Sequence, residues 1–494
     1  MKFNGKILII GCGSVSQCAI PLLLKLVDMP ANKITIMDFV DNRSRVKDAL
    51  DKGVTYVIDR VTIDNYAQLL AKYVGAGDLI IDLAWNIGCL AMLQWCRDNK
   101  VLYVNTSIEE WDPYKDSLRT DPTKYTLYYR HMLIREMLDK WGDNEGTTAI
   151  VDHGANPGLV SHFTKKALID IAEKIMAESK DRGRILQLEG ALQTNNFAKL
   201  AQLEGVKVIH ISERDTQITD KPKKVNEFVN TWSIEGFFEE GVAPAELGWG
   251  THERIIPHKA FFHKDGPKNQ ICLSTVGMKT WVRSWVPCGE ITGMVIRHGE
   301  AFSISDRLTV WENGEAVYRP TVHYAYCPSD CAINSLHELE MRQFDLQKDQ
   351  RIMSDEIISG ADELGVLLMG HDFKSWWTGS LLTIEETRRL VPHQNATTLQ
   401  VAISVIAAAI WMMKNPKRGF KLPDDIDHED ILDIAIPFIS PLVSRPVDWT
   451  PLDNMNLKYA EFGSQRPNTE DVWQFTTFLI DPLRRKIAHE AVEV

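Results

Sequence analysis

Short apolar runs alternate with amphipathic stretches over the first 150 residues of the chain. The runs are rich in β-branched residues and apolar on both faces, as strands buried inside a parallel sheet are. Strands are therefore expected at residues 6–10, 34–37, 54–58, 78–82, 101–104 and 147–151. Helices are expected at residues 41–52, 65–74, 88–99 and 125–141. This order predicts an α/β domain over residues 1–155 with a right-handed, doubly wound parallel sheet.

The pattern changes near residue 156, where strands follow one another with irregular connections. Further strands are expected at residues 186–194, 206–212, 271–276, 294–297 and 303–310. They predict a second α+β domain with a mixed sheet over residues 156–420, which we expect to bind the substrate and to carry a dimer contact. Residues 421–494 return to a helical pattern, including residues 471–480, and the sequence leaves open whether this C-terminal segment packs on the first domain.

The longest strongly apolar stretch, residues 401–413, is too short to span a bilayer and predicts a core helix. Asn395 and Thr397 are candidate capping residues before it, and Asn415 and Pro416 end it. Near the N-terminus, a glycine turn interrupts the apolar run, which argues against a signal peptide. We therefore expect no membrane partner and a cytoplasmic location.

A glycine turn follows the first predicted strand. Gly11 turns the chain, and Gly13 removes a side chain where a pyrophosphate would approach the backbone. Ser16 occupies the third position of the G-x-G-x-x-G pattern and is small enough for the helix to pack on the strand. Ser14 and Val15 begin that helix, whose free N–H groups would hold phosphates. The turn predicts a Rossmann-type nucleotide site, although glycine is also common in turns that bind nothing.

Asp38 ends the second predicted strand, near the expected spacing for an acid that binds the adenosine ribose. Its carboxylate would accept from the ribose hydroxyls and repel a 2′-phosphate, which favours NAD, while Arg43 and Arg45 keep NADP open. The ends of the later strands are expected to line the nicotinamide crevice or, as the alternative, to cap helices. These residues are Ala84, Trp85, Asn105 and Thr106.

Composition narrows the classes of partner and cofactor. The chain has 494 residues, of which 44% are hydrophobic and 25% charged, and its formal net charge is -12. The negative charge argues against a nucleic-acid partner and suits a cationic ligand. Eight cysteines are scattered along the chain, and the close pair Cys327 and Cys331 lacks a second Cys/His pair that would complete a zinc site. We predict free thiols in a reducing compartment and no metal.

An aromatic residue beside carboxylates marks residues 231–241. Gly236 and Gly241 are expected to break any long helix, so that Trp232, Glu239 and Glu240 lie on a loop. An aromatic face attracts an alkylammonium or iminium by roughly 0.5 to 2 kcal/mol, and a carboxylate fixes one end of such a cation. The alternative is a surface pair of acids with the tryptophan in the core.

Asn156 also has two interpretations. With Pro157 after it, it matches the N-cap and first residue of a helix, and a role in a binding site is equally compatible with its position.

Several stretches together resemble the bacterial homospermidine synthases, which are saccharopine reductase-like enzymes, and the resemblance covers essentially the whole chain. They are K-I-L-I-I-G-C-G-S-V (6–15), I-D-L-A-W (81–85), N-T-S-I-E-E-W (105–111), D-H-G-A-N-P-G-L-V (152–160) and residues 232–240. The resemblance implies that two putrescines, or spermidine and putrescine, give homospermidine with release of ammonia or diaminopropane. It also implies that tightly bound NAD is recycled during oxidation to an imine, transimination and re-reduction, and that the enzyme is a homodimer.

The same resemblance implies roles for seven side chains. Trp232 would stabilise the iminium, Glu240 would anchor the incoming diamine, and His298 would form a polar wall or proton relay. Glu213 and Asp362 would handle ammonium groups or protons. Asn156 and Glu109 would position the reacting nitrogen, with Glu110 as the neighbouring choice.

The sequence is also compatible with two other functions. A saccharopine or carboxynorspermidine dehydrogenase-like reductase would need an Arg or Lys in its pocket for a carboxylated substrate and would often use NADPH. A non-catalytic NAD(H) sensor would need the glycine turn alone and gives no reason to gather the acids with Trp232.

Overall fold

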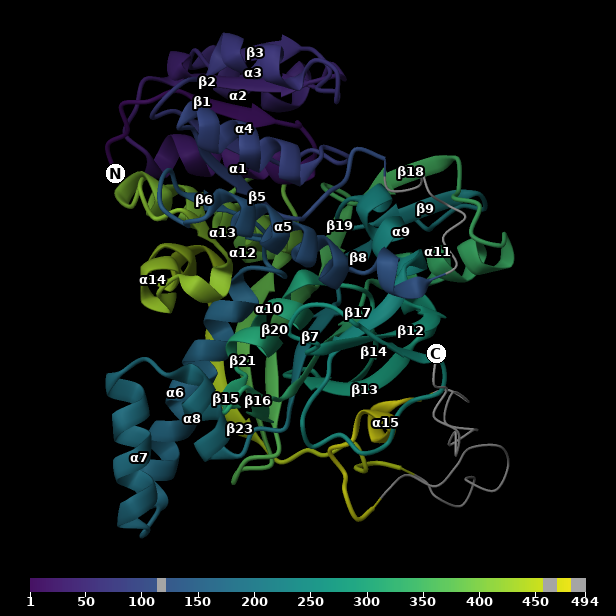
Figure 1. Ribbon diagram of the computed structural model, residues 1–494. Helices are drawn as coiled ribbons and strands as arrows, with labels where there is room; N and C mark the ends of the chain where they lie inside the picture. The colour runs from purple at the N-terminus through teal and green to yellow at the C-terminus, as the bar shows by residue number, and fades with distance from the viewer. Residues whose placement is uncertain (113–120, 456–468, 481–494) are drawn as a thin grey trace.

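The computed structural model describes residues 1–112, 121–455 and 469–480, and these residues form two large sheets with helices around them (Figure 1). The first sheet has seven parallel strands in the order β22-β6-β5-β4-β1-β2-β3. Its strands are β1 (Ile7–Ile10), β2 (Ile34–Asp38), β3 (Thr55–Ile58), β4 (Leu79–Asp82), β5 (Leu102–Asn105), β6 (Ala149–Ile150) and β22 (Phe420–Lys421). All six strands expected before residue 151 are present, which confirms the doubly wound sheet.

Helices connect these strands as the sequence predicts, with one difference. The connecting helices are α1 (Ser14–Leu26), α3 (Tyr66–Tyr73), α4 (Cys89–Asn99) and α5 (Leu127–Trp141), and short 3-10 turns lie at η1 (Ala31–Lys33) and η3 (Pro122–Tyr125). The helix expected at residues 41–52 is instead a 3-10 turn, η2 (Arg43–Val46), followed by the short α2 (Lys47–Asp51). The seventh strand, β22, escaped the sequence analysis because it has two residues and returns from a distant part of the chain.

The second sheet has ten strands and is mixed, because β7 is parallel to β17 and antiparallel to β20. The path runs β11-β12-β10-β17-β7-β20-β21-β23, and β14 joins β13 to β17. The strands are β7 (Val208–Asp215), β10 (Pro244–Gly248), β11 (Ala260–Phe262), β12 (Gln270–Val276), β13 (Trp281–Val286), β14 (Gly289–Met294), β17 (Thr321–Cys327), β20 (Ala361–Met369), β21 (Ser375–Thr383) and β23 (Leu442–Val447).

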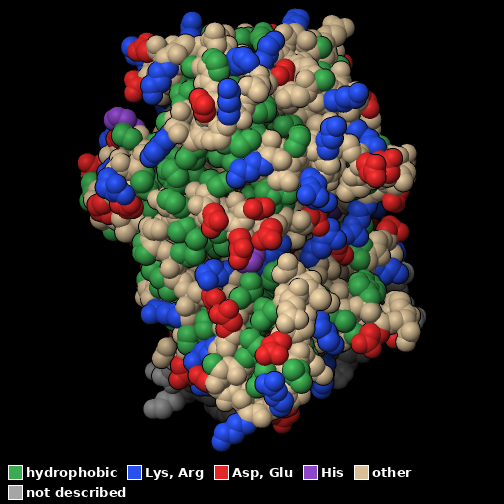
Figure 2. Space-filling model, turned by 90° about the vertical axis from the view of Figure 1, so that its left-hand side faces the viewer, with side chains coloured by type: hydrophobic (Ala, Val, Ile, Leu, Met, Phe, Trp, Pro, Cys, Tyr) green, Lys and Arg blue, Asp and Glu red, His purple; other side chains and the backbone are tan. Residues whose placement is uncertain are grey.

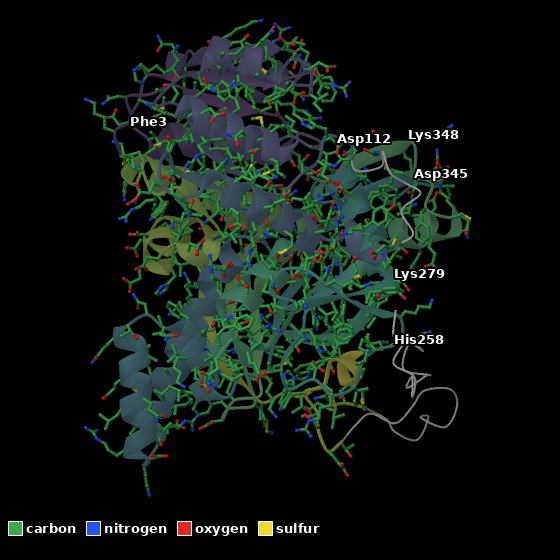
Figure 3. The ribbon with its side chains drawn as sticks, in the orientation of Figure 1. Phe3, Asp112, His258, Lys279, Asp345 and Lys348 are labelled. Atoms are coloured by element: carbon green, nitrogen blue, oxygen red, sulfur yellow. The ribbon has the colours of Figure 1, made fainter. Side chains whose placement is uncertain are left out.

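Three two-stranded sheets and several helices complete the second part of the chain. The small sheets pair β15 (Val310–Glu312) with β16 (Glu315–Tyr318), β9 (Glu227–Asn230) with β18 (Asp349–Ile352), and β8 (Ile218–Thr219) with β19 (Ile357–Ser359). The helices are α6 (Leu159–Glu178), α7 (Arg182–Gln193), α8 (Phe197–Glu204), α9 (Ile234–Val242), α10 (Gly299–Arg307), α11 (Asp330–Met341), α12 (Ile384–Leu390), α13 (Ala396–Lys414), α14 (His428–Ile439) and α15 (Phe475–Phe478), with η4 (Gly277–Lys279) and η5 (Pro423–Asp425). Side chains fill the space between the ribbons (Figure 3).

Several predicted strands are wrong. Residues 186–193 lie in α7 and residues 303–307 in α10, while the strand expected at 294–297 shares only Met294 with β14. In α7, the buried residues Leu188 and Ala191 are three positions apart, which is a helical spacing. Asp181 caps this helix by accepting from the amides of Gly183 and Arg184.

The C-terminal segment is helical only in part. It contains α14, but within residues 471–480 only the single turn α15 is helical, in place of the expected helix. The strand β23 pairs with β21 of the second sheet, and Phe475 and Phe478 are buried in the apolar cluster beneath that sheet. Burial of these aromatic side chains, rather than helix propensity, holds this end of the chain.

The expected core helix is confirmed and longer than predicted. Helix α13 packs against α1 and α14, and Asn395 caps it by accepting from the amide of Thr398. Thr397 lies inside the helix rather than at its cap. By length and composition α13 passes as a membrane span, but 94% of its apolar window is buried inside the protein, as in the core helix of a globular fold.

Candidate active site

The glycine turn leaves backbone groups free for phosphates. Gly11 has a φ of +89°, and a Cβ there would lie 2.9 Å from the carbonyl oxygen of Leu83. No heavy atom of the described residues lies within 4 Å of a Cβ built at Gly13, so space remains in front of this residue. Ser16 donates to the Gly11 carbonyl at 2.7 Å, and within the described chain no side chain caps α1. The N-terminus of α1 is therefore able to bind an anion.

Asp38 ends β2 beside this turn. Its carboxylate accepts from the amide of Cys12 at 2.5 Å and from the amide of Val40 at 2.8 Å, which fixes its orientation. Phe39 follows and is 65% exposed, with the Arg60 guanidinium 5.3 Å from its ring centroid. This flat surface was missed in the sequence analysis, and its signal is an exposed aromatic residue directly after Asp38.

The ends of β4 and β5 are partly used for internal contacts. The amide of Ala84 donates to Asp82, and the indole of Trp85 donates to Glu239 Oε2 at 3.2 Å. Asn105 is buried, accepts from the Asp152 amide at 3.0 Å and donates to Tyr103 Oη at 3.1 Å. These bonds make the Asn105 side chain part of the scaffold. Thr106 is half-buried and faces Gly154.

The loop expected around Glu239 and Glu240 is a helix, so that prediction was wrong. Gly236 and Gly241 both lie inside α9, and Ser233 caps it by accepting from the Gly236 amide at 3.1 Å. Burial of Ile234 and Phe237 outweighs the cost of two glycines, which is about 1 kcal/mol each relative to alanine.

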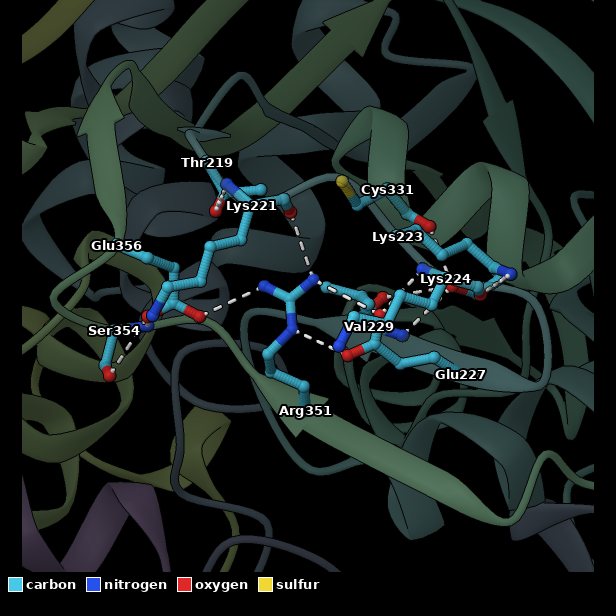
Figure 4. A network of polar contacts seen from close by, with 11 residues as sticks. Thr219, Lys221, Lys223, Lys224, Glu227, Val229, Cys331, Arg351, Ser354 and Glu356 are labelled. Atoms are coloured by element: carbon cyan, nitrogen blue, oxygen red, sulfur yellow. Dashed lines mark hydrogen bonds and ion pairs between the residues drawn. The ribbon is translucent and has the colours of Figure 1, made fainter.

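Trp232 stands just before α9. Its indole donates to Tyr326 Oη at 3.0 Å, and its ring centroid lies 5.2 Å from that of Phe237. The strand β9 that leads to it is held by Arg351, which binds Glu227 at 2.8 Å and Glu356 at 3.1 Å (Figure 4). This polar network fixes the backbone on which the tryptophan is presented.

Glu213 lies on β7 and is almost completely buried. Asn156 donates to its Oε2 at 2.9 Å, and Tyr324 Oη donates to the same oxygen. Burial raises the pKa of Glu213 to about 7, against the hydrogen bond from Tyr324, and the charge of Asp215 adds to the rise. The N-cap interpretation of Asn156 is wrong, because α6 begins at Leu159 after Gly158.

Asp362 lies on β20, which pairs with β7 so that it faces Asp215 in register. The Thr397 hydroxyl donates to its Oδ2, and Oδ1 has no partner among the described residues. Burial, together with the charges of Glu213 and Asp215, raises the pKa of Asp362 well above its ordinary range. The two buried carboxyls of Glu213 and Asp362 are therefore able to hold protons near neutral pH.

His298 precedes α10 and lies between two carboxylates. Its Nε2 is 3.0 Å from Glu240 Oε2, and its Nδ1 is 3.2 Å from Glu300 Oε1. Burial opposes protonation, but the charges of Glu240 and Glu300 outweigh it and raise the pKa of His298 well above its usual range. The imidazole ring also lies 4.3 Å from the ring of Tyr324. Glu300 and Tyr324 were missed by the sequence analysis, although Glu300 is two residues from His298.

Glu109 follows β5 and accepts from the Ser107 hydroxyl at 2.7 Å. Burial raises the pKa of Glu109 to about 7, and the nearby charge of Glu239 adds to the rise. Glu110 lies 3.6 Å from Arg130. Both residues are half-buried, and Oε2 of Glu109 is shielded from solvent.

These contacts join five of the seven predicted catalytic residues into one cluster. The charge of Glu213 acts on Asp362, whereas the side chain of Glu109 binds Ser107 outside this chain of contacts. Hydrogen bonds and ring contacts connect Asn156, Glu213, Tyr324, His298 and Glu240 in sequence, and Tyr324 stacks on Tyr326 at 5.1 Å, which binds Trp232. Acids around aromatic rings provide a site for a small organic cation. Within residues 1–112, 121–455 and 469–480, no group of three or more His, Cys, Asp or Glu is arranged to hold a metal.

A separate cavity of about 400 Å³ lies between α6, α8 and α10. Lys165, Arg307 and Asp424 contribute its charges, and none of the seven predicted catalytic residues lines it.

Comparisons with known proteins agree with the two-part fold described above. The Saccharopine dehydrogenase NADP binding domain matches residues 7–150, and the Saccharopine dehydrogenase C-terminal domain matches residues 154–447. Homospermidine synthase from Mesorhizobium japonicum is 37% identical over 97% of both chains. Homospermidine synthase from Blastochloris viridis is 39% identical over 97% of this chain and 98% of its own.

The chain belongs to the homospermidine synthase family. The fold agrees, since the crystal structure of the homospermidine synthase from Legionella pneumophila in complex with NAD has a TM-score of 0.85 to this chain. The two chains are 37% identical, and the match covers 97% of this chain and 99% of the other.

Proposed function

We propose that the protein is an NAD-dependent homospermidine synthase that transfers an aminobutyl group between diamines. The observation that carries the proposal is the cluster of buried carboxyls around Trp232. It lies beside the carboxyl ends of the strands that follow the glycine turn, where a doubly wound sheet binds its ligand. Putrescine, alone or with spermidine, is the substrate class that such a cluster recognises.

The nucleotide turn fits NAD. The space at Gly13, the uncapped N-terminus of α1 and the oriented carboxylate of Asp38 suit a pyrophosphate and an unmodified ribose, while Arg43 is paired with Asp41. When bound, NAD accepts a hydride from the carbon next to an amine and returns it after the amines have exchanged. The protein's own residues prepare the amine for that transfer.

Glu213 and Asp362 are proposed to handle the proton. Hydride can leave only from an uncharged amine, because the nitrogen lone pair must stabilise the developing cation, so a base must first take a proton from the ammonium. A carboxyl with a pKa near 7 exchanges protons readily at neutral pH, and burial raises the pKa of Glu213 to about 7. Asn156 donates to Glu213 through its Nδ2, which leaves its carbonyl oxygen to orient the N–H of the reacting amine.

The other residues of the cluster are proposed to hold positive charge. Trp232 offers its face to the iminium, and Glu109 lies on the nucleotide-domain side to orient the nitrogen. Glu240 anchors the far ammonium of the incoming diamine. Glu240 also pairs with His298 at 3.0 Å, so the ammonium of a diamine would compete with the imidazole for this carboxylate.

The arginines near the cluster distinguish this proposal from a reductase. Such an enzyme needs a free cation to bind its carboxylated substrate. Arg130 and Arg297 are both bound to the Glu239 carboxylate, so neither is free for this purpose. A sensor of NAD would not require the acid cluster.

The proposal includes a homodimer. A band of apolar side chains crosses the face formed by α1 and α14 (Figure 2), where Leu24, Ile434 and Ile436 are half-buried and Pro21 and Pro437 are exposed. A second copy of the chain would cover this band. The nucleotide unit is proposed to comprise residues 1–155 together with β22. The eight cysteines are free thiols, which suits a cytoplasmic location.

The direct test incubates the purified protein with NAD and putrescine and measures homospermidine and ammonia by mass spectrometry and an ammonia assay. We expect equal amounts of both products without net accumulation of NADH. Failure to form homospermidine, together with consumption of NADPH in the presence of an amino acid and an aldehyde, would establish the reductase instead.

A further inference from the structure

Glu239 precedes Glu240 on α9, and three donors from other segments converge on its carboxylate. Trp85, after β4, donates its indole N–H to Oε2 at 3.2 Å. Arg130, on α5, donates to Oε1 at 2.6 Å, and Arg297, between β14 and α10, donates to the same oxygen. Glu239 is 5% exposed, so both of its oxygens are used within the protein.

The two arginines extend these contacts toward the cluster. Arg130 also donates to the carbonyl of Ile108 at 2.7 Å, one residue before Glu109. Arg297 donates to the carbonyl of Tyr125 at 2.8 Å and directly precedes His298. Arg130 therefore contacts the residue before Glu109, and Arg297 is itself next to His298 in the chain.

Glu239 also stays charged over the whole working range. Burial disfavours the ionised form, but the charges of Arg297 and Arg130 outweigh it and lower the pKa of Glu239 to about 2. A carboxylate held between two guanidinium groups has a fixed direction, because each ion pair restricts the other. Both of its oxygens accept hydrogen bonds from other segments of the protein.

We propose that Glu239 is a positioning residue, which holds Glu240, Glu109 and His298 in register with the strand ends that face the nicotinamide. The role rests on the proposed function and adds a residue to it. Glu239 binds no substrate. It acts through the two arginines, and an error of about 1 Å in such alignment costs about 100-fold in rate.

The test uses the full-length protein with NAD and putrescine and the variant Glu239→Gln. Steady-state kinetics are measured at a temperature where circular dichroism shows that the variant is folded. We expect kcat to fall about 100-fold while the KM for putrescine changes less than about threefold, because alignment in the transition state is lost rather than ground-state binding. Putrescine deuterated next to its amines should show a larger isotope effect in the variant, since hydride transfer becomes slower.

Glu290→Gln is the matched control. It removes the same charge from the Arg283 ion pair on β13 and β14 and is expected to leave kcat and KM unchanged. Arg130→Lys is the second test variant if Glu239→Gln does not fold. Lysine keeps the positive charge but cannot bind both Glu239 and the Ile108 carbonyl in the same geometry. It should also lower kcat with little change in KM.

Three results would overturn the role. A large rise in KM with unchanged kcat would make Glu239 a diamine ligand, and a lower melting temperature with unchanged kcat would make it a stabilising residue only. An unchanged kcat in a folded Arg130→Lys variant would also exclude the positioning role of Glu239. If the unmodified protein forms no homospermidine, the proposed function fails and this role fails with it, whereas an active protein with an unaffected Glu239→Gln variant overturns this role alone.

Discussion

Trp232 is held on two sides, by Tyr326 and by Phe237, so its ring cannot turn away when a cation arrives. At the scale of single residues the site combines such fixed rings with carboxyls whose protons are exchangeable near neutral pH. This combination suits a reaction in which an ammonium group must first lose a proton, and the resulting amine then becomes a positively charged iminium when hydride leaves.

Replacement of the tryptophan tests the charge-stabilising role. Trp232→Ala is expected to lower kcat about 10- to 30-fold, since a desolvated cation–π contact contributes about 2 kcal/mol and each 1.36 kcal/mol is tenfold in rate. Trp232→Phe keeps an aromatic face and should lose less. NAD titration and circular dichroism should be unchanged in both variants. Unchanged turnover in Trp232→Ala would exclude the role.

Glu213 makes substrate binding depend on pH. Its pKa is about 7 in the folded protein against an ordinary 4.5, so it keeps its proton to higher pH than in the unfolded chain. Folding stability from this group therefore falls as pH rises from about 4.5 to 7. A diamine needs the ionised carboxylate, so the KM for putrescine should fall about tenfold per pH unit up to about pH 7 for each carboxyl that must ionise.

The variant Glu213→Gln isolates this contribution. Its KM should be higher than that of the unmodified protein at pH 8 and should depend less on pH, with a remaining dependence from Glu109. Kinetic measurements from pH 5.5 to 8.5 in one buffer series would show this. An identical pH profile in the two proteins would remove Glu213 from diamine binding.

At the scale of elements, the turn between β1 and α1 contains two glycines with different expected roles, Gly11 in the backbone turn and Gly13 in NAD binding. Gly11→Ala places a Cβ at positive φ and 2.9 Å from the Leu83 carbonyl, so it should lower the melting temperature. Gly13→Ala meets no atom of the described protein and has an ordinary φ of -75°, so it should fold normally. We expect it to weaken NAD binding at least tenfold, measured by calorimetry. Equal NAD affinity would place the pyrophosphate elsewhere.

Helix α9 shows where local sequence signals lose to packing. Its two glycines favour a loop, but Ile234 and Phe237 bury apolar area on one face and Ser233 supplies a cap. Burial of each such side chain contributes about 1.5 to 3 kcal/mol, so the two together outweigh the cost of about 1 kcal/mol for each glycine. The helix then places Glu239 and Glu240 in adjacent positions with different partners, one among arginines and one beside His298.

At the scale of the whole molecule, the apolar band on α1 and α14 is expected to be a dimer contact. Ile434→Glu introduces a charge into the band at a half-buried position and should shift the protein from dimer to monomer in sedimentation velocity experiments. Glu178→Gln, at the exposed end of α6, is the control and should not change the assembly. Sedimentation of the unmodified protein as a monomer at micromolar concentration would contradict the expected dimer.

The sequence by itself determined the nucleotide half of this protein. Buried parallel strands, the glycine turn and Asp38 are local patterns, because each depends on residues within one strand–turn–helix unit. The short motifs also identified the family and pointed to Trp232, Glu240 and Glu213. In the second domain the same approach mistook α7 and α10 for strands, since brief apolar runs look alike in helices and strands.

Only the tertiary structure decided which charges meet. Glu239 contacts Arg130 and Arg297 across about 60 to 110 positions of the chain, and the pairing of β20 with β7 places Asp362 opposite Asp215. Strand β22 likewise joins β6 from the far side of the second domain. Such contacts have no local signature, because the energy of a buried charge depends on the partners that folding brings to it and not on its neighbours in sequence.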